Sequence, residues 1–141
     1  KASYQVMRDK VMLSFADFAA RLPDEGGDRR LLGTSGTVTT LASVYLKLNS
    51  YDRRAVDGLH LPTSAMRDIS RELAHRNVKG RAEFPTIGHE RADLVVAGCA
   101  ILESIFDIWP GERLGVADRG IREGILRALI ASDANRRNRR N

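Results

Sequence analysis

The residues best suited to chemistry form a short run of glycines and hydroxyl side chains, namely Gly33, Thr34, Ser35, Gly36 and Thr37. The apolar pair Leu31-Leu32 precedes this run, and we interpret it as a buried strand end, while a helical apolar pattern starts at Val38. A strand-to-helix loop exposes backbone N–H groups beside the positive end of the helix dipole, and small residues let this backbone approach a phosphate. The run therefore predicts an anion-binding loop.

Pattern alone leaves a second interpretation of this run open. The loop contains neither the GxGxxG fingerprint nor the GK[ST] sequence of two familiar phosphate-binding loops. A tight turn in which Ser35 caps the following helix would need the same residue types. Ligand binding and helix capping are therefore equally good predictions from the spacing.

Two arginines lie near predicted helix starts and could also bind phosphate. Arg91 lies at the start of a helix predicted over about residues 90–107, and Arg119 lies just before the last predicted helix. An arginine in such a position can hold a phosphate through two hydrogen bonds. An arginine–carboxylate pair that joins the two helix starts is at least as good an interpretation, and we expect Asp118 to cap the last helix.

The chain offers no pattern for a metal site or for a nucleophilic catalyst. His60, His75 and His89 lack the spacing of metal ligands. Cys99 is the only cysteine, so neither an internal disulfide nor a cysteine-built zinc site can form, and its small apolar neighbours indicate core packing. We therefore predict no catalytic residue and no metal ligand in this chain, and a reducing compartment.

Composition and charge narrow the class of protein. The chain has 141 residues, of which 43% are hydrophobic and 29% charged, values typical of one globular domain or part of one. The net charge is +5, and arginines at positions 136, 137, 139 and 140 contribute to it, so we predict a basic disordered tail over residues 133–141 rather than a nucleic-acid-binding protein. The longest apolar stretch, near residues 94–105, is broken by Glu103 and is shorter than the roughly 18 residues that a membrane span needs.

The elements that must position these side chains alternate between helix and strand. Apolar residues at helical spacing predict helices over residues 11–22, 38–48, 63–73, 90–107 and 121–129. Strands are predicted to end at Leu32 and to span residues 113–117; residues 59–61 could form a third, and residues 77–88 are interpreted as a loop. This order predicts an α/β fold, but two or three short strands are fewer than an independent sheet usually has, so we expect further strands upstream of Lys1.

Four blocks of sequence occur in an order typical of one enzyme family. They are residues 32–42, LGTSGTVTTLA; residues 57–59, DGL; residues 91–98, RADLVVAG; and residues 118–124, DRGIREG. With these blocks the chain resembles the exopolyphosphatase and guanosine pentaphosphate phosphatase (Ppx/GppA) family over about residues 30–129. The number and order of the blocks make this resemblance specific.

The resemblance implies the two-domain fold of the actin, Hsp70 and sugar-kinase superfamily, in which the active site lies between two ribonuclease-H-like domains. Residues 1–132 resemble the C-terminal part of the second domain. Such a domain begins with a three-stranded meander, which accounts for the strands that we expect to be missing. The implied fold is a partial, helix-rich α/β domain with two or three short strands.

The resemblance also implies an activity, the removal of terminal phosphate from inorganic polyphosphate or guanosine pentaphosphate by a cytoplasmic, magnesium-dependent enzyme. The family's catalytic glutamate and acidic magnesium ligands belong to the missing N-terminal part of the protein, which is an expected partner; a homodimer is also expected. This chain alone should then be inactive. Gly33 to Thr37 would line the nucleotide or polyphosphate side of the cleft, and Arg91 and Arg119 would contact phosphate or brace the loop.

Two other classes of function stay open at this point. The chain could be a non-catalytic module whose glycine-rich run and arginine tail hold a nucleotide, polyphosphate or RNA. It could also be a purely structural piece in which the run only caps a helix. Activity of the complete protein on polyphosphate would distinguish an enzyme from the first class, and loss of binding in Ser35→Ala with unchanged stability would argue against the second.

Overall fold

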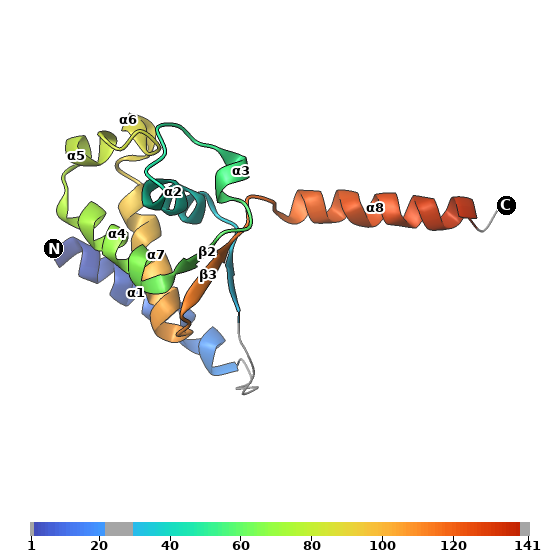
Figure 1. The fold of residues 1–141 in the computed structure, drawn as a ribbon. Coiled ribbons are helices and arrows are strands. Elements are labelled where there is room, and N and C mark those ends of the chain that lie inside the picture. The colour runs from blue at the N-terminus through green and yellow to red at the C-terminus, as the bar shows by residue number, and fades with distance from the viewer. Residues whose placement is uncertain (1, 22–29, 139–141) are drawn as a thin grey trace.

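Short strands alternate with helices along most of the chain, as the sequence predicts. The computed structural model describes residues 2–21 and 30–138. In chain order the elements are α1 (Ala2–Arg21), β1 (Leu31–Gly33), α2 (Gly36–Tyr45), α3 (Arg53–Val56), β2 (His60–Pro62), α4 (Thr63–His75), α5 (Val78–Ala82), α6 (Gly88–Arg91), α7 (Val95–Ile108), β3 (Arg113–Val116) and α8 (Ile121–Asn138). The first ten of these elements form one body, and α8 projects away from it (Figure 1).

The three strands form one small mixed sheet in the order β1-β3-β2. β1 runs parallel to β3, with Leu32 opposite Gly115, and β2 runs antiparallel to β3, with His60 opposite the same glycine. Successive side chains of a strand point to opposite faces of the sheet. Leu61 and Leu114 therefore face the helices and are 3% exposed, whereas Leu32 lies on the other face and is 67% exposed. The predicted strand at Leu31-Leu32 is confirmed, but its second leucine is not buried.

The core lies between the sheet and helices α2, α4 and α7. The apolar stripe predicted within residues 63–73 is confirmed, since Met66 and Leu73 are fully buried and Ile69 packs against the same cluster. α7 is buried on most sides, as predicted, and its Cys99 and Phe106 both lie in the core. The carboxyl ends of the parallel strands β1 and β3 thus lie beside helices that pack in this core.

Two predictions about the middle of the chain are wrong. Residues 77–88, predicted as a loop, contain α5, which Asn77 caps by accepting the Gly80 N–H at 2.8 Å. The helix predicted over residues 90–107 is two helices, α6 and α7, separated by residues 92–94. α6 begins at Gly88, whose φ of +61° turns the backbone in a way that glycine tolerates best. Apolar periodicity misses such local capping and turning signals.

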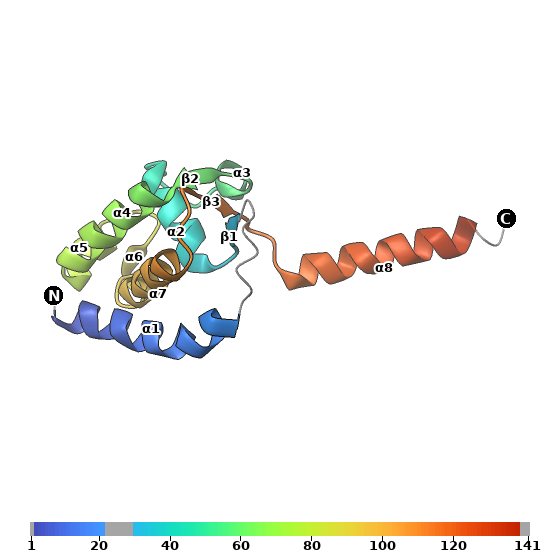
Figure 2. The ribbon, with the colours of Figure 1, turned by 90° about the horizontal axis from the view of Figure 1, so that it is seen from below.

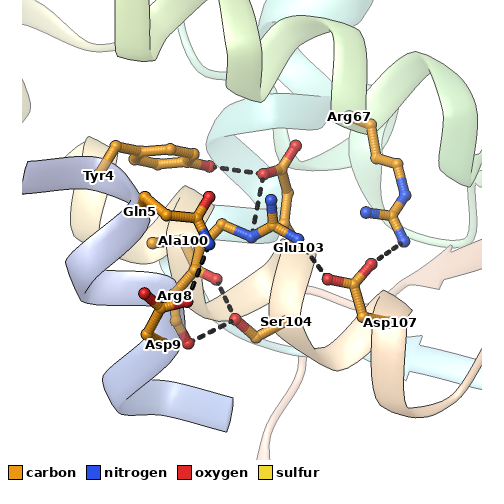
Figure 3. A network of polar contacts seen from close by, with 9 residues as sticks. All are labelled: Tyr4, Gln5, Arg8, Asp9, Arg67, Ala100, Glu103, Ser104 and Asp107. Atoms are coloured by element: carbon orange, nitrogen blue, oxygen red, sulfur yellow. Dashed lines mark hydrogen bonds and ion pairs between the residues drawn. The ribbon is translucent and has the colours of Figure 1, made fainter. Parts of the chain in front are cut away.

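A network of polar contacts fastens α1 to α7 (Figure 3). The Tyr4 hydroxyl donates to Glu103 Oε2 at 3.0 Å, and Arg8 Nε lies 3.7 Å from the same carboxylate oxygen, which is almost completely buried. Arg8 also donates to Asp107, and Arg67 of α4 donates to the second Asp107 oxygen at 2.8 Å. Burial opposes ionisation of Asp107, but the hydrogen bonds from Arg67 and Arg8 lower its pKa. Charged groups therefore fix the register of α1 on the body.

Aromatic contacts hold the second half of α1. The rings of Phe15 and Phe18 meet the Trp109 ring edge-on, with centroids 6.1 and 6.0 Å apart. Seen from below, α1 lies alongside α7 as the outermost layer of the body (Figure 2). Its outward side includes apolar residues among polar ones, since Val6 is 50% exposed and Leu13 is 79% exposed.

The last helix, α8, is longer than predicted and carries exposed apolar side chains. Residues 133–138, predicted as part of a disordered tail, continue α8, and residues 139–141 lie outside the described part of the chain. Alanine and arginine are strong helix formers, and cations complement the dipole near a helix C-terminus. More than half of the surface of Ile125, Leu126 and Leu129 is exposed. None of the helices in residues 2–21 and 30–138 combines the length and the apolar character that crossing a bilayer requires.

Candidate phosphate-binding site

The loop predicted to bind an anion lies between the end of β1 and the start of α2, and we name residues 33–37 the glycine-threonine loop. Ser35 caps α2, because its backbone is extended (φ −91°, ψ 159°) and its Oγ accepts the Val38 N–H at 3.4 Å. The capping interpretation of Ser35 is thus confirmed. Capping does not close the loop, since Thr34, Ser35 and Gly36 are all exposed to solvent.

Buried hydroxyl groups behind the loop bond to the backbone of α2. Thr39 Oγ1 donates to the Gly36 carbonyl at 3.1 Å, and Ser43 Oγ donates to the Thr39 carbonyl at 2.8 Å. Both side chains are at most 5% exposed. The threonine-rich start of α2 therefore has a polar but internally bonded inner side, and the outer side of the loop is left for a ligand.

The glycines of the loop are required for different reasons. A Cβ on Gly33 would lie 2.6 Å from Val38 Cγ2, so the close approach of β1 to α2 excludes a side chain there. A Cβ on Gly36 would meet nothing within 4 Å, and Gly36 is the first residue of a regular helix. A side chain at position 36 would therefore not strain the turn, and only access of a ligand to the backbone depends on this glycine.

A third glycine shapes the loop from the opposite helix. A Cβ on Gly98 of α7 would lie 2.2 Å from Thr37 Oγ1 and 2.8 Å from Thr37 Cγ2. The absence of a side chain at Gly98 thus lets α7 support the loop at van der Waals distance. Gly98 is not among the site residues that the sequence predicts. The sequence feature that could have identified Gly98 is a glycine in the middle of an otherwise apolar helix, because such a glycine usually has a packing reason.

Arg91 shares a pocket with the loop. Its Nη1 donates to Thr40 Oγ1 at 3.3 Å, so α6 is tied to the first turns of α2. A shallow pocket of about 130 Å³ lies between them and is lined by Gly36, Thr37, Thr40, Arg91, Leu94 and Val95. A guanidinium and the N-terminal backbone of a ten-residue helix therefore face the same small space. Such an arrangement can bind an anion of the size of one phosphate group.

Arg119 lies in a neighbouring part of the same sheet edge. It follows β3, which is parallel to β1, so both chain segments leave the sheet at the same edge. Arg119 does not line the pocket that contains Arg91, and its Nε lies 3.5 Å from Asp57 Oδ2. The two arginines thus contact Thr40 and Asp57, and the ion pair expected between the two helix starts is replaced by these contacts.

Asp118 has a different role from the helix cap that the sequence predicts. Its carboxylate lies 2.7 Å from Arg53 Nε. The start of α8 is instead bonded by Glu123, whose Oε2 accepts the Gly120 N–H at 2.9 Å. This hydrogen bond from the backbone lowers the pKa of Glu123. Glu123, in the first turn of α8, therefore accepts a backbone N–H at the helix start, which is the capping role that was expected of Asp118.

We assign no catalytic set to the other chemistry-bearing side chains in the part of the chain that the structure describes. Cys99 is fully buried, and burial raises the pKa of its thiol to about 11, so it stays protonated at neutral pH. In residues 2–21 and 30–138, no three His, Cys, Asp or Glu side chains come together in a way that could hold a metal ion. The loop and Arg91 therefore offer binding groups for an anion without a general base beside them.

An apolar hollow of about 350 Å³ adjoins the loop between β1 and α7. Besides residues of the loop, it is lined mainly by leucine and isoleucine side chains, namely Leu31, Leu32, Ile101, Leu102, Ile105 and Leu114. These walls suit apolar groups and not a phosphate. The groups at this edge that could bind an anion thus lie on the α2–α6 side of the loop.

Comparisons with proteins of known sequence and structure relate this chain to a phosphatase family. The model of the Ppx/GppA phosphatase family matches residues 1–132. A Haemophilus influenzae protein named 'Putative exopolyphosphatase' is 26% identical over 104 residues, which are 73% of this chain and 30% of that protein.

Two solved structures share the fold. A Ppx/GppA family member from Aquifex aeolicus superposes with a TM-score of 0.73 at 22% identity, covering 92% of this chain and 40% of its own. An exopolyphosphatase from Cytophaga hutchinsonii gives a TM-score of 0.77 at 16% identity, covering 94% of this chain and 43% of its own. The expected fold, a helix-rich and partial α/β domain, is thereby confirmed.

The extent of the matches defines what this chain corresponds to. It spans less than half the length of each of these relatives, and the two solved structures match 92% and 94% of its own residues. Because the family model covers residues 1–132 of 141, the chain belongs to the Ppx/GppA phosphatase family.

Proposed function

We propose that the complete protein hydrolyses terminal phosphoanhydride bonds of inorganic polyphosphate or guanosine pentaphosphate, and that this chain supplies part of the phosphate-binding side of its site. The observation that carries this proposal is the pocket in which Arg91 faces the glycine-threonine loop at the start of α2. Family membership supports a phosphatase, and the named activity of the relatives supports polyphosphate as one substrate.

The proposed role of the loop is to neutralise phosphate charge. Phosphoryl transfer depends mainly on positioning and on stabilising negative charge at the transferred group. The N–H groups at the start of α2 and the Arg91 guanidinium supply positive potential without a nearby carboxylate in the pocket lining. Arg119, which Asp57 engages, fits the bracing role implied by the resemblance better than direct contact with phosphate.

Magnesium does not fit the described residues of this chain. Magnesium prefers carboxylate and water oxygens in near-octahedral geometry. The pocket beside the glycine-threonine loop is lined by glycine, threonine, arginine and aliphatic residues, and residues 2–21 and 30–138 contain no acidic cluster that could hold the ion. We therefore infer that the magnesium ligands and the group that positions the attacking water belong to the rest of the complete protein.

Binding of tripolyphosphate by this chain tests the proposal. We expect measurable binding by isothermal titration calorimetry, and Arg91→Gln should weaken it by about tenfold, as expected for loss of a charged hydrogen bond. Arg71→Gln is the matched control, because Arg71 is an exposed arginine of α4 that pairs with Asp68. No binding, or equal loss in both variants, would contradict the proposal, as would a complete protein that releases no phosphate from polyphosphate.

A further inference from the structure

Two sequence blocks that the phosphate pocket does not use lie side by side in the structure. They are Asp57-Gly58-Leu59 and Asp118-Arg119-Gly120. Asp57 Oδ1 accepts the Asp118 N–H at 3.0 Å, and its Oδ2 lies 3.5 Å from Arg119 Nε. Gly58 has a φ of +87°, and its N–H donates to the Val116 carbonyl at 2.8 Å. The turn at Gly58 thus presents Asp57 to the connection between β3 and α8.

Arg53 of α3 holds the same connection from a second direction. Its Nε lies 2.7 Å from Asp118 Oδ2, and its Nη2 donates to the Asp118 carbonyl oxygen at 2.7 Å. The side chain, N–H and C=O of Asp118 are therefore all engaged. We name Arg53, Asp57, Asp118 and Arg119 the connector clamp. One exposed ion pair contributes little, but several contacts that converge on one short segment act together.

A single residue, Ala117, links the connector clamp to the glycine-threonine loop. The Ala117 N–H donates to the Gly33 carbonyl at 2.9 Å. Ala117 directly precedes Asp118, and Gly33 is the first residue of the loop. Because Asp57 and Arg53 fix Asp118, they also restrict Ala117, and Ala117 in turn orients the peptide that opens the loop.

We propose that Asp57 is a positioning residue, which acts through the connector clamp to hold the glycine-threonine loop in its anion-binding conformation. Arg119 is then the partner that orients the Asp57 carboxylate. The binding part of this inference rests on the proposed function, whereas the structural part concerns only the bond between Ala117 and Gly33. Each part has its own measurement.

Amide hydrogen exchange tests the structural part. In the ¹⁵N-labelled chain, Asp57→Ala should accelerate exchange of the Ala117 amide by at least about fivefold, because local opening becomes easier. Asp57→Asn keeps an acceptor for the Asp118 N–H but loses the charge opposite Arg119, so a smaller acceleration is expected; Arg119→Gln should match it. Asp68→Asn, which breaks the Arg71 pair on α4, should leave the Ala117 amide unchanged. Unchanged exchange in Asp57→Ala would overturn the clamp.

Tripolyphosphate affinity tests the binding part in the same variants. The dissociation constant should rise about fivefold or more in Asp57→Ala, rise less in Asp57→Asn and stay constant in Asp68→Asn. Faster Ala117 exchange with unchanged affinity would overturn the positioning role. If the parent chain does not bind tripolyphosphate, the proposed function fails, while the exchange rates still decide whether the clamp orders Gly33. If Asp57→Ala does not fold, Asp57→Asn and Arg119→Gln carry both measurements.

Discussion

At the scale of single residues, two glycines at the glycine-threonine loop lack a side chain for different physical reasons. Gly36 faces open space, whereas Gly98 touches Thr37 so closely that a methyl group would overlap its hydroxyl. Substitutions at these two positions therefore separate ligand access from packing.

Gly36→Val should weaken tripolyphosphate binding without lowering the midpoint of thermal unfolding by more than a few degrees. A valine side chain has room in the free protein, but it would project beside the N–H groups that approach the phosphate. Calorimetry and circular dichroism measure the two quantities. Gly124→Val in α8, also an open glycine position, is the control and should leave binding unchanged. Equal affinities for Gly36→Val and the parent chain would remove this part of the loop from the site.

Gly98→Ala should destabilise the chain by about 1–3 kcal/mol, because overpacking forces α7 and the loop apart. Urea unfolding followed by circular dichroism gives this free energy. Gly124→Ala is the comparison, since alanine in an exposed helix stabilises by about 0.5–1 kcal/mol relative to glycine. A Gly98→Ala protein as stable as the parent would show that Thr37 can move away without cost.

At the scale of elements, α1 depends on a hydrogen bond between residues 99 positions apart. The Tyr4 hydroxyl donates to the buried Glu103 carboxylate, and burial, followed by the charge and hydrogen bond of Glu103, raises the pKa of Tyr4 far above its ordinary value of 10.0. Protonated Tyr4 is thus favoured in the folded state. Its contribution to stability should be complete below about pH 10 and should decrease as the pH rises further.

Tyr4→Phe should cost about 1–2 kcal/mol at pH 7, because the buried Glu103 loses a donor. The difference between the parent and Tyr4→Phe should shrink above pH 10, where unfolded tyrosine ionises. Urea unfolding between pH 7 and pH 11 measures both effects, with the exposed Tyr45→Phe as control. A constant difference across this range would contradict the assignment of the pKa shift to Tyr4.

At the scale of the whole molecule, β1 is an edge strand of the sheet, and α8 is set apart from the body. Within the described residues, β1 pairs only with β3, and Leu32 is 67% exposed at that edge. The helix α8 projects away from the body (Figure 1). Its apolar residues Ile125, Leu126 and Leu129 are more than half exposed. Unpaired strand edges and large apolar patches favour association with another chain.

The isolated chain should therefore associate with itself at micromolar concentration, as measured by multi-angle light scattering. Leu32→Lys places a charge at the open edge and should reduce this association, whereas Leu13→Lys on the outer side of α1 should reduce it less. A monodisperse monomer of 15.6 kDa would show that the edge and α8 do not drive pairing.

The isolated chain should also release no phosphate from polyphosphate with magnesium. Its described pocket supplies an arginine and backbone donors but no carboxylate that could position water. A colorimetric phosphate assay with the complete protein as positive control checks this. Magnesium-dependent turnover by the 141-residue chain would mean that it holds a catalytic group we have not assigned.

Local signals in the sequence were sufficient to predict many features of this protein. The spacing of Met66, Ile69 and Leu73 predicted a buried helix face, and Ser35 before Val38 predicted a cap, because the contacts involved lie within about two helical turns. The four sequence blocks identified the family for the same reason, since each is a contiguous segment with its own backbone geometry.

Only the tertiary structure decided which distant residues meet. Gly98 against Thr37, Tyr4 against Glu103 and Asp57 against Arg119 are contacts over 61 to 99 positions, which no periodicity encodes. Such contacts depend on how the sheet and helices pack, and packing satisfies buried charges and excludes overlapping atoms across the whole chain at once. The sequence therefore determined the elements and the loop, and the fold determined which side chains hold that loop in place.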